Sequence, residues 1–376
     1  MKISIGVDLH KRQFTTCMMS EDRKVEEWGV YPTTEIGYQE FLQRAEVYET
    51  EGYKLTAAVE STGNTRYFRN RLLKAGIGVT VVNTVKFKIV KESVKKTDKH
   101  DAKNLGVFLE KEMLPESILC SQQSEDIRRV IKARSIVVKA QVSLKNQVHG
   151  LLLGYGIESK KGQLQSKKER QRILSGLEDH AGYGSAAIAV EPLLDTIDQL
   201  NGQVKKLEKV LEELVKEDED VALLQTIPGI GIIGAATIRA FTDDISRYSS
   251  AKKYAAYAGL VPWVQISDET VHYGHITKRG PVELRTAFVQ AVMGMIRLQK
   301  YTESYRIMSK YRKMKKNKGS GTSIIAAARK MSTIVYAILT SREPFDPIKM
   351  AFSKKYSEMQ SAAVNADKAG ESSKAG

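Results

Sequence analysis

The first part of the chain is built around the hexapeptide Ile3-Ser4-Ile5-Gly6-Val7-Asp8. Its β-branched apolar residues are typical of a buried strand, and the run ends in a carboxylate. A buried carboxylate costs free energy unless a cation lies close to it, because burial disfavours the charged form. The hexapeptide therefore predicts a core strand that ends at a cation-binding position, Asp8.

Two later stretches carry acids that are placed to share this cation. Leu55-Thr56-Ala57-Ala58-Val59-Glu60 is a second apolar strand ending in an acid, and Lys96-Thr97-Asp98-Lys99-His100-Asp101 has two acids three residues apart. On a helix this spacing puts both acids on one face, about 5–6 Å apart at Cβ. Like charges that close repel one another, and a bound divalent cation relieves the repulsion.

We predict that Asp8, Glu60, Asp98 and Asp101 meet at one sheet edge, where open α/β sheets place their sites. Oxygen ligands without a cysteine or paired-histidine pattern favour Mg²⁺ or Mn²⁺ over zinc. Two such ions can activate a nucleophile and stabilise the leaving oxygen in phosphodiester cleavage. Each acid alone also has a structural interpretation, as a helix cap, a surface acid or a strand-end residue. Only the combination predicts a metal site.

The composition indicates a globular protein with a polyanionic partner. The chain has 376 residues, 42% of them hydrophobic, which is enough for two or three domains. Lys+Arg 59 against Asp+Glu 44 gives a net charge of +15 and favours nucleic acid over a merely solvated basic surface. Cys17 and Cys120 are the only cysteines, which excludes a disulfide scaffold and fits a reducing cytosol.

The sequence gives no signal for secretion or for a membrane span. Asp8 and Lys11 interrupt the N-terminus where a signal peptide needs an apolar run. The most apolar later segment, 322–339, contains Arg329 and Lys330 and is too polar to cross a bilayer. We therefore expect a cytoplasmic protein with no membrane partner.

Residues 1–120 are predicted to form an α/β domain. A hairpin at the start is followed by strands and helices in alternation, which implies a mixed sheet flanked by helices. A helix capped by Thr97 or Asp98 then runs to about residue 113. A hairpin, an adjacent strand and a later helix, each bearing an acid, is the layout of the ribonuclease-H-like nuclease fold. The remaining expected elements are strands at 55–60 and 78–83 and helices at 36–50 and 64–75.

Residues 121–220 are predicted to form a helical middle domain. A basic helix covers 125–155, and a hinge or nucleic-acid-facing loop covers 156–172. Within 193–214 the apolar residues alternate at spacings of four and three, as in a coiled coil of about three heptads. That seam joins two protomers or pairs with the 125–155 helix of the same chain; an ordinary amphipathic helix is the remaining alternative.

Residues 221–350 are predicted to be mostly helical, with a disordered tail at 351–376. The turn Pro228-Gly229-Ile230-Gly231 is typical of a helix–hairpin–helix or of a plain helix–helix turn. A loop is expected at 259–280, with helices at 282–298 and 323–340. Lysines, arginines and tyrosines interleave at 299–321, which suits a nucleic-acid path or a solvated linker.

At these residues the chain resembles a known family. Gly6-Val7-Asp8, Val59-Glu60-Ser61-Thr62-Gly63 and Lys96-Thr97-Asp98-Lys99-His100-Asp101-Ala102 are similar to the three acidic motifs of the DEDD transposases of the insertion-sequence 110 family. The resemblance extends through Ile227-Pro228-Gly229-Ile230-Gly231, the segment 254–262 and Ile276-Thr277-Lys278-Arg279-Gly280. It implies a RuvC-like N-terminal domain, a coiled coil and a C-terminal transposase domain.

The resemblance also implies a nucleophilic serine a few residues after Gly259-Leu260-Val261-Pro262. Ser267 is the only serine in that loop and takes the role. Asp268 follows it where the family usually has glycine, so Thr270 stays a second candidate. A phosphoserine intermediate keeps the phosphoester energy for rejoining, without a nucleotide cofactor. We hypothesise a composite site in which the metal-bound acids activate the serine.

Two kinds of nucleic-acid contact complete the hypothesis. Lys278, Arg279 and Arg285 are candidate phosphate clamps, or equally surface charges. The resemblance further implies a structured non-coding guide RNA that pairs with donor and target DNA. The heptad seam at 193–214 separately predicts a homo-oligomer formed through the coiled coil. If an RNA guide selects the DNA sequence, the protein needs no sequence-reading motif of its own. This agrees with the lack of a helix-turn-helix or zinc-finger pattern.

Three rival functions remain open at this point. A hydrolytic RuvC-like nuclease or junction resolvase would use the same metal site and leave no protein–DNA adduct. An actin-like or sugar-kinase ATPase also begins with a hairpin bearing an aspartate, but Leu9-His10-Lys11-Arg12 lacks the expected phosphate-binding glycines. A degenerate nucleic-acid-binding protein would need no acids, whereas all four are present.

Overall fold

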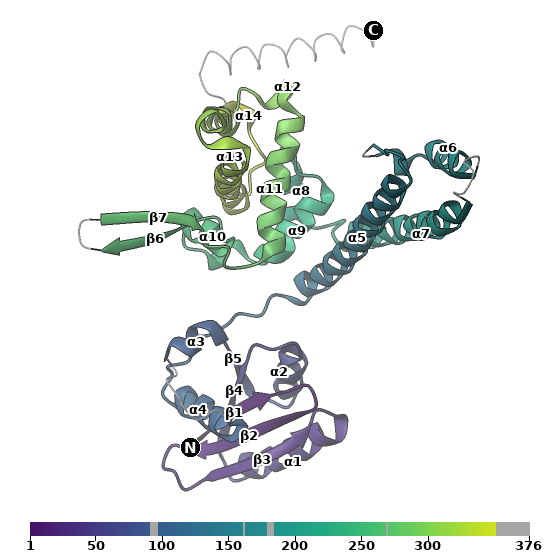
Figure 1. The fold of residues 1–376 in the computed structure, drawn as a ribbon. Helices are drawn as coiled ribbons and strands as arrows, with labels where there is room; N and C mark the ends of the chain where they lie inside the picture. Colours follow the sequence, from purple (N-terminus) through teal and green to yellow (C-terminus); the bar gives the residue numbers. More distant parts are fainter. Residues whose placement is uncertain (91–96, 161, 179–183, 268–269, 351–376) are drawn as a thin grey trace, which may run out of the picture. The chain divides into compact units, whose positions relative to one another are not determined.

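The computed structural model describes residues 1–376 except 91–96, 161, 179–183, 268–269 and 351–376 (Figure 1). The tail expected to be disordered, 351–376, therefore lies outside the described residues. The chain divides into two compact units, Met1–Cys120 and Ser121–Gly376. The first unit is a mixed α/β layer structure and the second is mostly helical. A separate domain boundary near residue 220 remains a prediction.

Unit 1 contains a five-stranded sheet in the order β3-β2-β1-β4-β5. β1 pairs antiparallel with β2 and parallel with β4, so it lies at the centre of the sheet. This mixed order is compatible with a ribonuclease-H-like fold. The strands are β1 (Lys2–Leu9), β2 (Gln13–Ser20), β3 (Glu26–Pro32), β4 (Lys54–Glu60) and β5 (Gly78–Val82).

Helices cover both faces of this sheet (Figure 1). Ile3, Ile5 and Val7 of β1 pack in one cluster with aromatic residues of α1 and α2, while Ala102 of α4 packs with Cys17 on the opposite face. The alternation of inward side chains along β1 follows from the two-residue period of a strand. The helices of unit 1 are α1 (Glu35–Thr50), α2 (Thr65–Lys74), α3 (Thr84–Val90) and α4 (Asp98–Glu110).

The expected strands and helices of unit 1 are present, but two further elements were not predicted. β3 begins with two glutamates, Glu26 and Glu27, and has Gly29 at its centre, which removes the apolar alternation of a strand. It forms at the sheet edge because β2 offers it an unpaired backbone. The short helix α3 precedes the undescribed residues 91–96 and had no periodic signal of its own.

A close contact between glycines fixes α4 on the sheet. A Cβ atom added to Gly6 of β1 would overlap the carbonyl oxygen of Ala102 and the backbone nitrogen of Gly106 in α4. A Cβ atom on Gly106 would lie 2.5 Å from Cε of Met19. The backbones of α4 and β1 can therefore approach directly, which aims the first turn of α4 at the end of β1.

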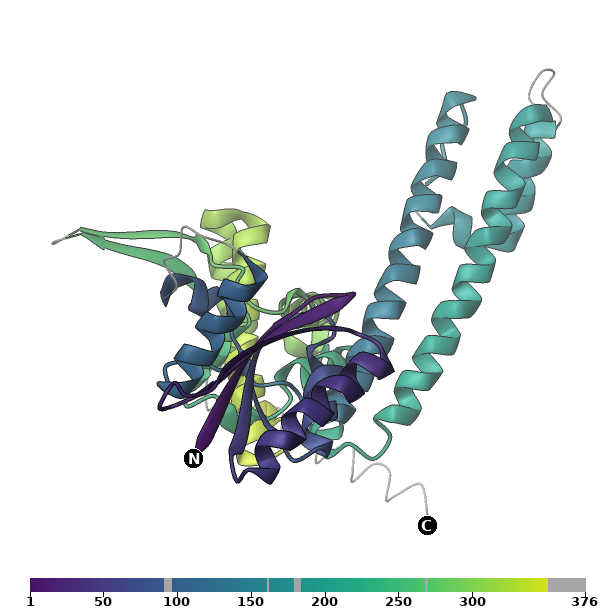
Figure 2. The same ribbon diagram turned by 90° about the horizontal axis from the view of Figure 1, so that it is seen from below.

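Unit 2 begins with two long helices that run side by side in both views (Figures 1 and 2). α5 (Gln122–Gly154) and α7 (Gly184–Leu214) make extensive mutual contacts. Ile197 and Leu211 of the predicted seam are fully buried, and Arg134 of α5 donates hydrogen bonds of 2.9 and 2.7 Å to Glu208 of α7. These contacts support pairing of the seam with the 125–155 helix of the same chain. A coiled-coil geometry of the two helices stays a prediction.

The loop predicted for 156–172 is partly wrong. The helix α6 (Lys167–Glu178) begins inside that range, after the short turn η1 (Gln163–Gln165). Leu164 and Leu177 are almost fully buried and pack with Val148 and Leu152 of α5. This cluster was not predicted, because the segment is rich in lysine and its few apolar residues do not follow a helical period.

The rest of unit 2 is a helical core with one projecting hairpin. Phe288 of α11 and Val335 of α13 are fully buried in it. The predicted loop at 259–280 is wrong, because β6 and β7 form an antiparallel hairpin there. The elements are α8 (Glu219–Gln225), α9 (Ile232–Thr242), η2 (Ile245–Arg247), α10 (Ala251–Tyr257), β6 (Pro262–Ser267), β7 (Thr270–Ile276), α11 (Val282–Arg297), α12 (Gln299–Thr302), α13 (Arg306–Ser341) and α14 (Pro347–Met350).

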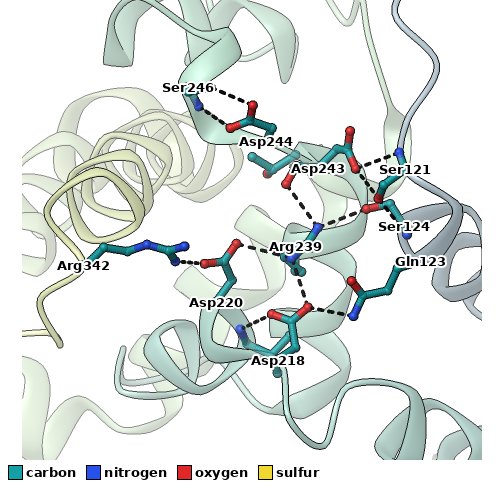
Figure 3. A network of polar contacts seen from close by, with 12 residues as sticks. Ser121, Gln123, Ser124, Asp218, Asp220, Arg239, Asp243, Asp244, Ser246 and Arg342 are labelled. Atoms are coloured by element: carbon teal, nitrogen blue, oxygen red, sulfur yellow. Dashed lines mark hydrogen bonds and ion pairs between the residues drawn. The ribbon is translucent and has the colours of Figure 1, made fainter.

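A buried ionic network joins the start of α5 to α8 and α9 (Figure 3). Arg239 lies 3.1 Å from Asp218 and 3.3 Å from Asp220, and it donates a 3.0 Å hydrogen bond to Ser124. Asp218 also caps α8, and its side chain is only 5% exposed. These opposite charges pair with one another, so the network ties the elements of the core together.

Among the described helices, α13 alone is long and apolar enough to cross a membrane, so the expectation that segment 322–339 is too polar to do so is wrong by length and composition. Half of its apolar window is buried inside unit 2, and Ala328, Met331 and Val335 belong to the core. These side chains are used for packing, as in the core helix of a globular protein.

Candidate metal and nucleophile sites

Asp8 and Glu60 lie at the same edge of the sheet. Val7 pairs with Val59 in the parallel ladder of β1 and β4, so the acids occupy the next position on each strand. Parallel strands present their carboxyl ends together, which is where sites form in open α/β sheets. The side chain of Asp8 is 18% exposed, and Glu60 is half-buried.

Asp98 and Asp101 both lie in the first turn of α4. Thr97 caps this helix, since its hydroxyl accepts a 3.2 Å hydrogen bond from the backbone nitrogen of His100. The predicted cap is therefore confirmed as Thr97. Acids in a first turn interact favourably with the helix dipole, and the packing of α4 on β1 brings this turn to the end of β1.

One histidine joins the acids that come closest together. Ligand atoms of Asp8, His10 and Asp98 all lie within 4.8 Å of one another. Nε2 of His10 is 3.2 Å from Asp8 and 3.7 Å from Asp98. In the described part of the chain, neither Glu60 nor Asp101 belongs to this tight group. His10 was not predicted as a site residue, although its place two residues after Asp8 in a hairpin turn was a usable signal.

Charge at this edge favours a cation. Burial raises the pKa of Asp8 above its ordinary value, and the nearby carboxylates of Asp98 and Asp101 raise it further, while His10 lowers it. The donor set of carboxylates with one imidazole fits a divalent cation, and the like charges would be neutralised by it. The residues present thus fit the metal that the acidic pattern implies.

Ser267 and Thr270 face each other across the tip of the β6–β7 hairpin. They form the last register pair of the two strands, and both are exposed. Residues 268–269 between them lie outside the described residues. Gln265 pairs with His272 two positions back, so these residues share a face with Ser267 and Thr270. Either hydroxyl is open to a large substrate.

The three predicted phosphate clamps differ in their surroundings. The guanidinium of Arg285 donates hydrogen bonds to the carbonyl oxygens of Ala258 at 3.3 Å and Lys278 at 3.2 Å. Through these bonds Arg285 stabilises the turn that follows the hairpin, so its side chain has a structural role. Lys278 and Arg279 are exposed beside it, with Lys278 in a left-handed conformation (φ 53°). They stay candidates for phosphate contact.

The strand order of the mixed sheet and the carboxylates at its edge are compatible with a ribonuclease-H-like enzyme that acts on nucleic acids. Comparison with family models agrees with this class. The DEDD transposase model of the IS110 group matches residues 5–157, and the model "Transposase IS116/IS110/IS902 family" matches residues 221–306. The chain belongs to the IS110 family of transposases and is a DNA transposase.

Curated relatives match nearly the whole chain. The transposase for insertion sequence element IS1111A of Coxiella burnetii is 24% identical over 91% of this chain and 90% of its own length. The pilin gene-inverting protein of Moraxella bovis is 27% identical over 92% of this chain and 98% of its own length. A probable family 20 transposase of Pseudomonas aeruginosa is 24% identical over 77% of this chain and 85% of its own length.

Proposed function

We propose that this transposase cuts and rejoins DNA through a phosphoserine formed by Ser267, with Mg²⁺ or Mn²⁺ held by Asp8, Glu60, Asp98 and Asp101. The observation that supports it most is the convergence of Asp8, His10 and Asp98, whose ligand atoms all lie within 4.8 Å of one another at the sheet edge. The RuvC-like character of unit 1 is part of this proposal. Its strand order and edge acids support it.

The covalent step balances without a cofactor. Oγ of Ser267 forms a bond to phosphorus and loses its proton to solvent, while the bond from phosphorus to the leaving sugar oxygen breaks and that oxygen gains a proton. Rejoining is the reverse attack by a sugar hydroxyl on the phosphoserine, so no phosphoester energy is lost. A bound divalent cation would supply charge stabilisation for both oxygens. Asp8, Glu60, Asp98 and Asp101 would hold it, and His10 would orient Asp8.

A suicide DNA substrate tests the nucleophile. The DNA carries an element end with a nick near the cleavage position, so that the cut fragment diffuses away and an adduct accumulates. We expect a denaturation-resistant protein–DNA adduct with the native chain and with Thr270→Ala, but none with Ser267→Ala. An undiminished adduct with Ser267→Ala would reject the assignment. Free ends without any adduct would favour the hydrolytic nuclease or resolvase.

A guide RNA is the second part of the proposal. The net charge of +15 supports a second polyanion besides DNA. Sequencing of RNA that copurifies with the chain should return a structured transcript from DNA flanking its gene. Recovery of bulk cellular RNA alone would contradict a dedicated guide.

Self-association through α7 is the third part. Ile188 and Val210 of this helix are 75% and 49% exposed, although the other face of α7 packs on α5. Light scattering of the full chain should give a mass above one protomer, and Val210→Glu should lower it. We place the enzyme at the nucleoid of the bacterial cytoplasm, where its DNA lies.

A further inference from the structure

A cationic cleft lies at the base of the β6–β7 hairpin, within unit 2. It has a volume of about 740 Å³ and is bounded by Pro262 and Ile276 of the hairpin and by α13. α13 lines it from both sides of the kink at Gly319, where the backbone leaves helical geometry (φ 74°, ψ 172°). Met314 precedes the kink and Ala326 follows it, so the bend shapes the cleft.

The charges around the cleft have one sign. Lys278, Lys310, Arg329 and Lys330 line it, and no aspartate or glutamate does. In the described part of the chain none of these cations takes part in an ion pair of the structure, unlike the arginines of the buried network. A second hollow, in unit 1, carries charges of both signs, since Lys2 and Lys54 line it together with four glutamates, Glu21, Glu110, Glu112 and Glu116. The cleft therefore selects for an anion.

The walls of the cleft are apolar. Leu260, Pro262, Met314 and Ile325 form surfaces that suit the flat face of a nucleobase, while the cations suit its phosphates. The volume lies in the range of small-molecule sites and is too small for a duplex. The occupant that fits both the walls and the charges is one unpaired nucleotide with its flanking phosphates.

We propose that this cleft holds an unpaired nucleotide of the DNA strand that the enzyme cuts, which makes Lys310 and Arg329 positioning residues. The inference rests on the proposed role of Ser267. Ser267 at the tip is five residue steps along β6 from Pro262 at the cleft, or ~17 Å of strand. At 3.4 Å per stacked nucleotide, the bound nucleotide is roughly five positions from the scissile phosphate.

Binding is measured by fluorescence anisotropy with the full chain in EDTA, so that no strand is cut. The probes are a labelled single-stranded dT12, the dT12·dA12 duplex and the RNA rU12. Ala326→Trp fills the cleft and should weaken dT12 binding at least tenfold, while duplex affinity changes less than threefold. Lys310→Ala should weaken dT12 binding severalfold and make its logarithmic salt slope shallower by about 0.7.

Matched variants separate the cleft from general charge and from folding. Lys252→Ala removes an exposed lysine of α10 that does not line the cleft, and should change affinity less than twofold. Ala326→Ser keeps the cleft open and should bind as the native chain does. Melting temperatures of all variants report folding. Ultraviolet crosslinking of 4-thiothymidine in dT12 should attach to the peptide containing Met314.

Three results would overturn the proposal: undiminished dT12 binding by a folded Ala326→Trp variant, equal losses for dT12 and duplex, or a preference for rU12 that the same variant abolishes. The last result would assign the cleft to RNA. These affinities do not depend on the adduct assay. If Ser267→Ala still forms an adduct, the nucleophile is wrong while the cleft result stands, and the converse also holds.

Discussion

The two sets of candidate catalytic residues are held in very different ways. Asp8 and Asp98 project from a strand buried on both faces and from a helix packed on it through Gly6. Ser267 and Thr270 lie on a two-stranded ribbon whose side chains are exposed or half-buried along its length. Metal ligands need fixed positions before the ion arrives, so packing supplies them. A nucleophile on a ribbon depends on its bound DNA for a fixed position.

The largest expected effect in this comparison comes from removing the charge of Asp8 at the sheet edge of unit 1. Asp8→Asn keeps the shape of the side chain but takes away a carboxylate ligand, and should lower the metal-dependent cleavage rate by about 10³-fold. Thr270→Ala, on the ribbon, should change the rate less than threefold. Single-turnover cleavage with Mg²⁺ measures both. A cleavage rate for Asp8→Asn near the native value would remove the metal site from the mechanism.

Substitutions in the helical core of unit 2 should reduce the free energy of unfolding far more than substitutions in the β6–β7 ribbon. Arg239→Ala leaves the buried Asp218 without its cation and should reduce the free energy of unfolding by about 3–4 kcal/mol. Ile266→Thr changes a ribbon side chain that is 70% exposed, and should cost less than about 0.5 kcal/mol. Urea denaturation gives both values. A large effect of Ile266→Thr would mean that the ribbon packs against something in solution.

Replacing Gly6, which lies against the backbone of α4, should reduce stability more than replacing a glycine that has open space around it. Gly6→Ala forces α4 away from β1 and should cost about 2–3 kcal/mol, with weaker Mg²⁺ binding because Asp98 moves with the helix. Gly63→Ala is the matched control, since nothing lies within 4 Å of its added Cβ atom. Denaturation and Mg²⁺ titration should separate the two variants, and equal behaviour would contradict the packing argument.

The smallest expected effect is on the pH dependence of stability. Because the pKa of Asp8 is raised by folding, the folded state holds that proton more tightly than the unfolded state does, and ionised Asp8 destabilises the metal-free protein. Asp8→Asn should therefore be more stable than the native chain at pH 7 in EDTA. The gap should close as the pH falls toward 3.8, the ordinary value for the side chain. A gap that widens on acidification would reverse the sign.

Local patterns predicted what depends on neighbours along the chain. The β-branched apolar run predicted the buried strand that carries Asp8, and the Thr97 cap marked the start of the helix that carries Asp98 and Asp101. The hairpin at 262–276 was missed because Trp263, Gln265 and His272 interrupt its alternation with exposed residues on both faces. A ribbon without a buried face has no apolar signature to read.

The sequence by itself determined the acidic motifs, the central strand, the family and the positions of most helices, since period, caps and charge are properties of short segments. Only the tertiary structure decided that His10 joins Asp8 and Asp98 while Glu60 and Asp101 lie outside that tight group, that α7 packs on α5, and that a kink in α13 opens a cationic cleft. These depend on how distant segments approach, which is set by the volumes of residues such as Gly6 and Gly106 and by backbone geometry at Gly319.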